Sequence, residues 1–306
     1  MATIALKVDV ETWRGTCEGV PALMHLLERF DAPATFLFSL GPDHSGRALK
    51  RLFRPGFFGK VARTSALGHY GLKTLLYGTL LPGPDIGKRE VATLRAVEQA
   101  GFETGVHSWD HVRWQDGVAT ANEAWTRREL ERATARYADI FGHTPAVHGA
   151  AGWQMNEAAY RIEGELGYSV ASDTRGDSPF LPVDAHGQRI GPPQFPTTLP
   201  TLDELLGVDG WDASNVHLAI QQHSDNGAEV QVYTLRAELE GQKLLPTFEQ
   251  LLHVWRDQGH QFATLGELPK LVDISNLPRR RPGMGTVPGR SGQLAVAGPA
   301  AQRATS

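Results

Sequence analysis

The chain has 306 residues, and its 30 Lys and Arg against 34 Asp and Glu give a formal net charge of −4. This length allows one large domain or two small ones, and the composition excludes a disordered chain, a collagen-like fibre and a disulfide scaffold. The lone Cys17 cannot form an intrachain disulfide. We expect no signal peptide and no membrane-spanning helix, because the sequence has no long uncharged apolar run.

Short apolar runs alternate with segments of helical periodicity along most of the chain. Thr120 and Glu123 form a capping-box pattern that predicts the start of the helix ending near Tyr137. Repeated βα units predict a mostly parallel sheet, either open or closed into a barrel, and the pattern alone does not choose between them. The expected strands are 4–8, 34–40, 103–107, 146–148, 168–171, 229–235 and 261–264, and the other expected helices are 21–30, 91–100, 157–166 and 247–257.

Residues 47–81 differ from the rest of the chain, and we call them the basic–apolar segment. No acidic residue lies between Asp43 and Asp85, whereas seven Lys or Arg residues are interleaved there with Leu and Phe. One interpretation is a solvated basic face over ordinary core. The other is a membrane-interface insertion, about 44–84, that lies among anionic headgroups without crossing the bilayer.

The composition changes again near the C-terminus. Residues 276–306 are rich in Gly, Pro and Ala and carry no carboxylate and no periodicity. We therefore predict a domain over residues 1–275 followed by a disordered tail over 276–306.

Two groups of residues with chemical potential follow predicted strands. Asp9 and Glu11 lie at the end of the first strand, and His107 and His111, spaced i, i+4, follow the third. Because parallel α/β folds place their active sites at the carboxyl ends of the strands, these side chains are expected to converge. Taken alone, two acids at a strand end are more often surface residues or helix caps, and two histidines spaced i, i+4 often occur by chance.

Taken together, two imidazoles and one carboxylate form a 2-His-1-carboxylate set that holds a divalent metal with open positions for water and substrate. The second carboxylate is then available as a base. Hydrolysis of an amide is therefore the favoured chemistry, and a non-haem iron oxygenase is the less economical alternative.

Seven motifs in order resemble the polysaccharide deacetylase (NodB-homology) superfamily. The similarity is greatest to its deformylases that act on a formamido sugar carried on undecaprenyl phosphate. It implies a distorted (β/α) barrel with the metal at its C-terminal mouth. The motifs begin at Asp9, Gly41, Tyr77, His107, Gly149, Pro196 and Tyr233, and Ser172-Asp-Thr-Arg-Gly176 adds to them.

The resemblance also implies roles for individual residues. Asp9 matches the general base, and Asp173 and Arg175 match a pair that orients it. The implied metal ligands are Glu11, His107 and His111, and the implied lining of the sugar pocket is Ala150, Ala151, Gly152 and Trp153.

Three positions depart from the family pattern. Glu11 stands in place of an aspartate ligand, and Cys17 in place of an arginine. Arg236 occupies the position of the general-acid histidine, and guanidinium does not titrate near neutral pH. Arg236 is then expected to stabilise an oxyanion or bind phosphate, and Glu238 is expected near the substrate as another source of the proton.

The resemblance implies a metal-dependent deformylase of 4-deoxy-4-formamido-L-arabinose linked to undecaprenyl phosphate, in lipid A modification and polymyxin resistance. A divalent ion (Zn, Co, Mn or Fe) is the expected cofactor. The expected partners are the lipid-linked sugar and the inner-membrane surface, not nucleic acid, and the expected location is cytoplasmic and peripheral to that membrane. Two alternatives stay open: a deacetylase of another N-acylated sugar, and a catalytically impaired homologue that only binds a lipid-linked sugar.

Overall fold

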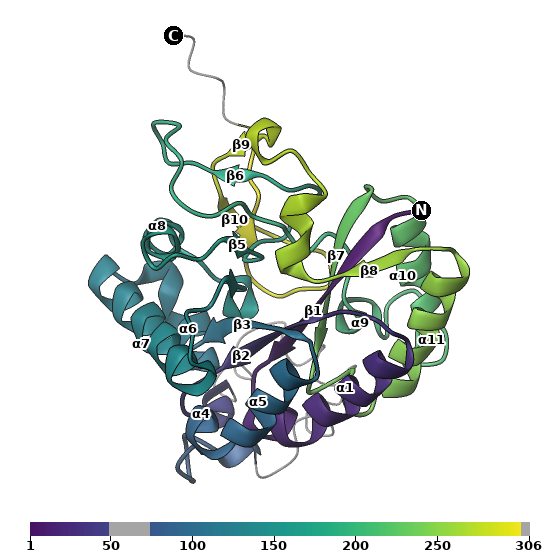
Figure 1. Ribbon diagram of the computed structural model, residues 1–306, viewed down its shortest axis with the longest axis horizontal. Helices are drawn as coiled ribbons and strands as arrows, with labels where there is room; N and C mark the ends of the chain where they lie inside the picture. Colours follow the sequence, from purple (N-terminus) through teal and green to yellow (C-terminus); the bar gives the residue numbers. More distant parts are fainter. Residues whose placement is uncertain (49–73, 301–306) are drawn as a thin grey trace.

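The structure is a computed structural model that describes residues 1–48 and 74–300. Its centre is a seven-stranded sheet in the order β5-β4-β3-β2-β1-β7, and β8 also pairs with β1 (Figure 1). Every pairing in this sheet is parallel, as the alternating pattern predicts. The strands are β1 (Thr3–Val10), β2 (Thr35–Ser39), β3 (Glu103–Ser108), β4 (Val147–His148), β5 (Val170–Ala171), β7 (Val230–Arg236) and β8 (Gln261–Ala263).

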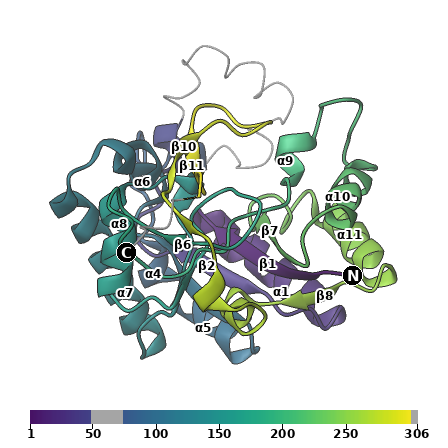
Figure 2. The same cartoon turned by 90° about the horizontal axis from the view of Figure 1, so that it is seen from above.

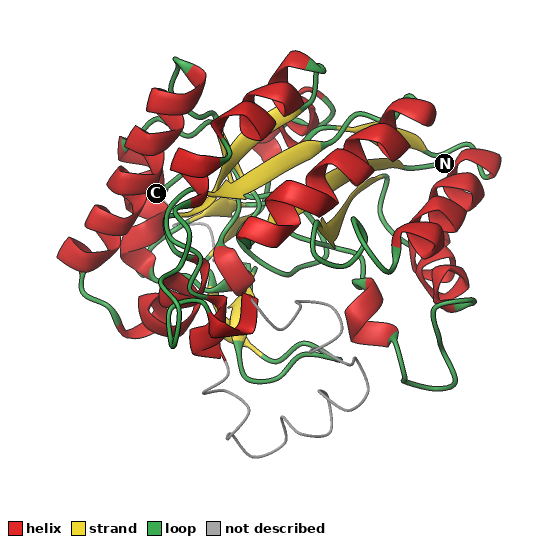
Figure 3. Ribbon diagram, turned by 90° about the horizontal axis from the view of Figure 1, so that it is seen from below, coloured by secondary structure: helices red, strands yellow, loops and turns green. Residues whose placement is uncertain are grey.

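Helices surround the central strands (Figure 3), with α7 and α8 on one side of the molecule and α10 and α11 on the other (Figures 1 and 2). The helices are α1 (Val20–Arg29), α4 (Ile86–Arg89), α5 (Val91–Gln99), α6 (His111–Gly117), α7 (Glu123–Phe141), α8 (Glu157–Glu165), α9 (Leu202–Leu205), α10 (Val216–Asp225) and α11 (Leu245–Asp257). Short 3₁₀ or π turns are η1 (Gly15–Gly19), η3 (Thr74–Leu76), η4 (Val118–Thr120), η5 (Ala151–Trp153), η6 (Leu265–Lys270) and η7 (Ile274–Asn276).

Strand β1 is the middle of the fold because three other strands pair with it. Residues Thr3–Asp9 pair with β7, the first residues of the strand with β8, and its last four residues with β2. The apolar residues Ile4, Leu6 and Val8 are fully buried in the main core, which also contains the inner faces of α1 and α11. The carboxyl end of β1 is therefore enclosed by neighbours on both sides.

An irregular segment joins the two edges of the sheet. Phe195 donates its backbone N–H to Ala171 of β5, and Thr198 and Leu199 donate theirs to Val232 of β7. The sheet thus curves round and is closed by a stretch that is not a regular strand. This is the distorted (β/α) barrel that the family resemblance implies, and that expectation is confirmed.

The start of α7 differs from the sequence prediction. The N-cap is Asn122, whose side-chain oxygen accepts a hydrogen bond from the Trp125 N–H at 2.9 Å. Thr120 instead ends a separate 3₁₀ turn. The capping-box interpretation is wrong because the Asn122 side chain reaches the first free N–H groups of the helix directly.

The predicted disordered tail is also wrong for the described residues 276–300. This stretch forms β9 (Arg279–Arg280), which pairs with β6 (Leu181–Pro182), and a hairpin of β10 (Gly283–Gly285) and β11 (Leu294–Val296). Leu294 and Ala295 are buried. Apolar contacts on the body of the molecule therefore order a sequence that has little local preference for structure.

Most of the basic–apolar segment, residues 49–73, lies outside the described residues. The flanking part that is described includes a buried Tyr77, whose ring packs edge-on against Trp13. Within residues 1–48 and 74–300, none of the helices is long and apolar enough to cross a membrane.

Candidate metal centre and active site

Four of the side chains singled out in the sequence converge at the carboxyl ends of β1 and β3. Asp9 is near the end of β1, and Glu11 follows it. His107 is in β3, and His111 is the first residue of α6 because Asp110 caps that helix by accepting a hydrogen bond from the Arg113 N–H. The turn between β3 and α6 therefore brings both imidazoles to one place.

The expected metal ligands lie close enough to bind one ion. One ligand atom from each of Glu11, His107 and His111 lies within 4.8 Å of the others. His111 Nε2 is 3.5 Å from Glu11 Oε1, and the two imidazole rings are stacked with centroids 5.3 Å apart. Glutamate at position 11 thus reaches both histidines despite its extra methylene.

His107 has the chemical state that a metal ligand needs. Its Nδ1 is 2.7 Å from the Gly149 carbonyl oxygen, so the proton is on Nδ1. Nε2 is buried and, among the described residues, has no hydrogen-bond partner. Burial, reinforced by His111 and Lys7, lowers the pKa of His107 well below its ordinary value. The neutral ring therefore presents an unshared electron pair, and the donor set fits a divalent ion.

Asp9 lies beside these ligands and is 3% exposed. Its Oδ1 is 3.7 Å from His107 Nδ1 and 3.6 Å from Lys7 Nζ. Burial raises the pKa of Asp9 to about 7, although Lys7 opposes this shift. A carboxyl group that titrates near neutral pH is well suited to accept and return a proton.

Lys7 is a site residue that the sequence analysis missed. Its side chain is fully buried, and Nζ donates a hydrogen bond to the Ser172 carbonyl oxygen at 2.9 Å. Nζ also lies 5.4 Å from the centre of the Trp153 ring. A buried charge requires partners. The sequence feature that could have identified it is a lysine in the middle of an otherwise apolar predicted strand.

The expected orienting pair, Asp173 and Arg175, does not contact Asp9. Asp173 accepts a hydrogen bond from His148 Nδ1 at 2.8 Å, and Arg175 is paired with Glu204. The side chain that links this part of the chain to Asp9 is Lys7, through the backbone of Ser172. The sequence motif therefore identifies the right region but the wrong contacts.

Asp173 instead belongs to a fully buried cluster with His148 and Glu163, whose Oε1 is also 2.8 Å from His148 Nδ1. Burial alone would lower the pKa of His148, but the two carboxyl groups raise it to about 10. Burial and Asp173 raise the pKa of Glu163 to about 8. At neutral pH these raised pKa values keep both His148 and Glu163 protonated, so the imidazolium is paired with one carboxylate, that of Asp173.

Glu238 does not face the site as the sequence analysis expects. It is 1% exposed, and its Oε1 accepts hydrogen bonds from the Glu11 and Thr12 N–H groups and from the Thr12 hydroxyl, at 3.0, 2.8 and 2.9 Å. Burial, with a contribution from Glu11, raises the pKa of Glu238 to about 8. Glu238 therefore fixes the turn that carries Glu11.

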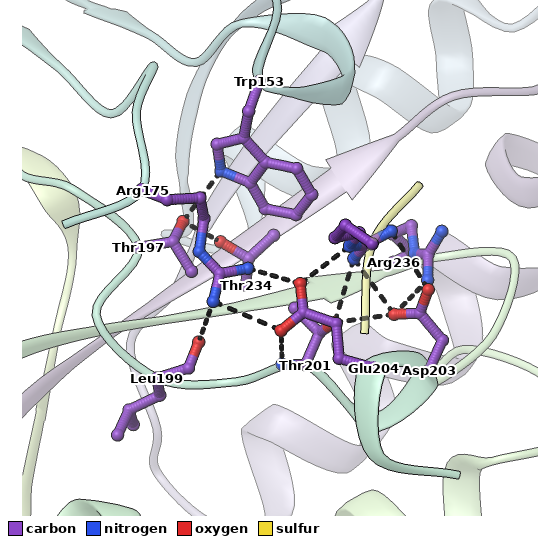
Figure 4. Close-up of polar contacts among 10 residues, drawn as sticks. Trp153, Arg175, Thr197, Leu199, Thr201, Asp203, Glu204, Thr234 and Arg236 are labelled. Atoms are coloured by element: carbon purple, nitrogen blue, oxygen red, sulfur yellow. Dashed lines mark hydrogen bonds and ion pairs between the residues drawn. The ribbon is translucent and has the colours of Figure 1, made fainter. Parts of the chain in front are cut away.

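Arg236 ends β7 opposite Asp9 in the parallel register. Its guanidinium forms an ion pair with Asp203 at 2.5 Å (Figure 4). Trp153 is 4% exposed and donates its indole N–H to the Thr197 hydroxyl at 3.2 Å (Figure 4). The preceding Ala150 and Ala151 are buried and Gly152 is partly buried, so the role of this segment in a sugar pocket stays a prediction.

The half-buried thiol of Cys17 does not have the character of a nucleophile. Burial and the nearby Glu90 raise its pKa to about 12. The thiol is therefore protonated at neutral pH, and the interpretation as a small packed residue is favoured.

The polysaccharide deacetylase family profile matches residues 2–171. A protein of Shewanella sediminis named 4-deoxy-4-formamido-L-arabinose-phosphoundecaprenol deformylase ArnD is 36% identical over 89% of this chain and 87% of its own length. A protein of the same name from Wigglesworthia glossinidia brevipalpis is 31% identical over 92% of this chain and 97% of its own.

Among solved structures, a polysaccharide deacetylase from Mycobacterium smegmatis superposes with a TM-score of 0.64. The two chains are 16% identical, and the match covers 94% of this chain and 96% of the other. This similarity supports the same fold.

We predict that the protein binds one divalent ion and that His107→Ala or Glu11→Ala weakens its affinity roughly 100-fold or more. Removing a residue that only hydrogen-bonds to a ligand typically lowers metal affinity about 10–100-fold, and these residues would be ligands themselves. Metal content after dialysis against Zn²⁺, Co²⁺, Mn²⁺ or Fe²⁺ measures this. The matched control is His143→Ala, an exposed histidine paired with Glu98; equal retention by all variants would contradict the site.

We predict that Glu238→Gln makes the unfolding free energy of the metal-free protein less dependent on pH. The folded and unfolded states of the variant should differ by about one bound proton less than those of wild type. The pKa of Glu238 is 4.5 in the unfolded chain and about 8 in the folded chain. Between these two pH values the folded chain retains a proton that the unfolded chain releases, so stability falls as pH rises. Glutamine keeps the accepting oxygen and has no such proton.

Urea unfolding at several pH values between 4.5 and 8 tests this, with exposed Glu131→Gln as the control. Parallel curves for wild type and Glu238→Gln would show that Glu238 is not the titrating group.

Proposed function

Because this chain belongs to the polysaccharide deacetylase family, we propose that it is a metal-dependent amide hydrolase. The proposed substrate is 4-deoxy-4-formamido-L-arabinose linked to undecaprenyl phosphate, and the products are formate and the 4-amino sugar used in lipid A modification. The observation that carries this proposal is the convergence of Glu11, His107 and His111 with Asp9 beside them. The two curated relatives with the deformylase name support the substrate.

Glu11, His107 and His111 would hold the ion, and zinc, cobalt, manganese and iron all suit this donor set. A bound divalent ion lowers the pKa of water and polarises a carbonyl oxygen. The hydrogen bond from His107 to Gly149 fixes the ring orientation that this requires.

Asp9 takes a proton from the water that attacks the formamide carbonyl. Burial raises the pKa of Asp9 in the metal-free chain, which increases its affinity for a proton. The C–N bond then breaks, and the leaving amine needs a proton that the Arg236 guanidinium does not give. We therefore assign the return of that proton to Asp9 itself, and to Arg236 the stabilisation of developing negative charge. One water and one formamide thus give formate and one protonated amine.

A substrate on a polyprenyl carrier stays in the bilayer, so the enzyme must work at the membrane surface. The basic–apolar segment suits the cytoplasmic face of the inner membrane, where anionic headgroups attract Lys and Arg. This part of the proposal rests on the sequence.

The replacement of a titratable histidine by Arg236 is the observation that favours a second candidate. In that candidate the chain binds a lipid-linked sugar without hydrolysing it. A deacetylase of another N-acylated sugar is the alternative within the same chemistry, and an acetyl substrate tested beside the formyl one distinguishes it.

We predict that Asp9→Asn lowers kcat for formate release from the lipid-linked sugar about 10²–10⁴-fold while substrate binding is retained, because Asn does not accept the proton. The assay uses metal-supplemented full-length protein. The control is Asp31→Asn, an exposed aspartate with a positive φ that asparagine also adopts. A wild-type protein that binds the substrate but releases no formate would favour the binding protein instead.

We predict that replacing four basic residues of the basic–apolar segment by Gln weakens binding to anionic vesicles by roughly 10²–10³-fold, since each contributes on the order of 1 kcal/mol near such a surface. Co-sedimentation with anionic and with zwitterionic vesicles measures this. The four positions are Lys50, Arg51, Arg54 and Lys60, and a control variant changes four exposed basic residues elsewhere, Lys88, Arg128, Lys243 and Lys270.

If the first variant keeps its fold and sediments with anionic vesicles as wild type does, the basic–apolar segment does not bind the membrane.

A further inference from the structure

The ordered C-terminal segment, residues 278–300, reaches the candidate active site. Strand β11 and the residue after it form two backbone hydrogen bonds with Arg175: the Arg175 N–H donates to Ala295 O at 2.9 Å, and the Ala297 N–H donates to Arg175 O at 3.0 Å. With Leu294 and Ala295 buried, the segment is fixed along the chain that follows β5.

The turn before β11 approaches the main domain so closely that it requires glycine. Gly289 has a φ of +77°, and a Cβ there would lie 2.6 Å from the Glu204 carbonyl oxygen. This conformation and this lack of space both exclude a larger residue. The next residue, Arg290, is consequently directed into the space beside α9.

Arg290 is held there by several contacts and its side chain is 15% exposed. Nε donates to Glu204 Oε1 at 2.7 Å, and Nη2 donates to Thr201 Oγ1 at 2.9 Å and to Asp203 Oδ1 at 3.1 Å. Nη1 lies 3.1 Å from Asp203 Oδ2. These contacts use Nε, Nη1 and Nη2, so the guanidinium is suited to hold neighbouring groups.

The groups that Arg290 contacts also hold the two other arginines of the site. Arg236 is paired with Asp203 Oδ1, and Arg175 is paired with Glu204 Oε1 (Figure 4). Burial would raise the pKa of Asp203, but Arg236 and Arg290 hold it well below its ordinary value. Asp203 is therefore a carboxylate shared by two guanidinium groups.

This network adjoins the proposed reaction centre. The Arg290 guanidinium lies 4.8 Å from the centre of the Trp153 ring, and Lys7, the partner of Asp9, lies 5.4 Å from the same ring. Arg236 is opposite Asp9 in the β1–β7 register. A change at Arg290 is thus transmitted over few contacts to the end of β7.

We infer that Arg290 is a positioning residue for Arg236, acting through the shared carboxylate of Asp203, and that the C-terminal segment is part of the active site. This inference rests on the proposed function for its effect on turnover. Without Arg290, Asp203 loses one of the two cationic partners that it has among the described residues, and its carboxylate is held only by the Thr201 hydroxyl and Arg236. The position of Arg236 is then less fixed.

The kinetic test is a double-mutant cycle on the full chain. Arg290→Ala is expected to lower kcat for formate release about tenfold with KM changed less than about threefold, and Arg290→Lys to recover part of the loss. In an Arg236→Ala background, Arg290→Ala should cost less than about twofold. Equal losses in both backgrounds would show that Arg290 does not act through Arg236.

A second measurement needs no substrate. In a spectrum of ¹⁵N-labelled arginine side chains, the Arg236 signals, assigned by their loss in Arg236→Ala, should show freer guanidinium rotation in Arg290→Ala. Unchanged Arg236 signals would overturn the inference whatever the activity. If the signals change but the wild-type protein releases no formate, the proposed function fails and the positioning stands.

The control is Arg281→Ala in the same segment, an exposed arginine that forms an ion pair with Glu157 at 3.7 Å. It should leave kcat and the Arg236 signals unchanged. Thermal unfolding of each variant separates loss of folding from loss of positioning, and Arg290→Lys keeps a cation in place if Arg290→Ala fails to fold.

Discussion

The pairing of β1 with three other strands is the constraint on which the candidate site depends. Lys7 and Asp9 lie on the face of β1 opposite Ile4, Leu6 and Val8, where the curved sheet encloses them, and both are buried. Burial of unpaired charges is costly, so the surrounding chain must supply contacts. It does so with the Ser172 carbonyl, the face of Trp153 and the edge of His107.

The same burial sets the protonation states at the site. It raises the pKa of Asp9 and lowers that of His107, so that one group exchanges a proton near neutral pH and the other stays neutral. These are the states that a general base and a metal ligand require. One physical cause, removal of water from the end of β1, thus prepares two different chemical roles.

Charged groups around the second half of the site are held in networks of buried partners. Arg175, Arg236 and Arg290 share the carboxylates of Asp203 and Glu204, and His148 lies between Glu163 and Asp173. Such networks lose much when one member is removed, because the remaining charge is then buried alone. They link the C-terminal segment to the barrel, although the family profile ends at residue 171.

The sequence by itself determined the parallel α/β architecture and the candidate metal ligands, because both depend on local patterns. Apolar runs fix the strands, and residues at the ends of parallel strands must meet at one edge of the sheet, which brings Glu11, His107 and His111 together. Tertiary structure alone decided the partner of Asp9, the place of Glu238 and the ordering of residues 276–300. Each of these rests on contacts between residues far apart in the chain: Lys7 with Ser172, Glu238 with Thr12, and Arg290 with Asp203. A composition rich in Gly and Pro has weak local preferences, so only the surface on which the segment packs determines whether it is ordered.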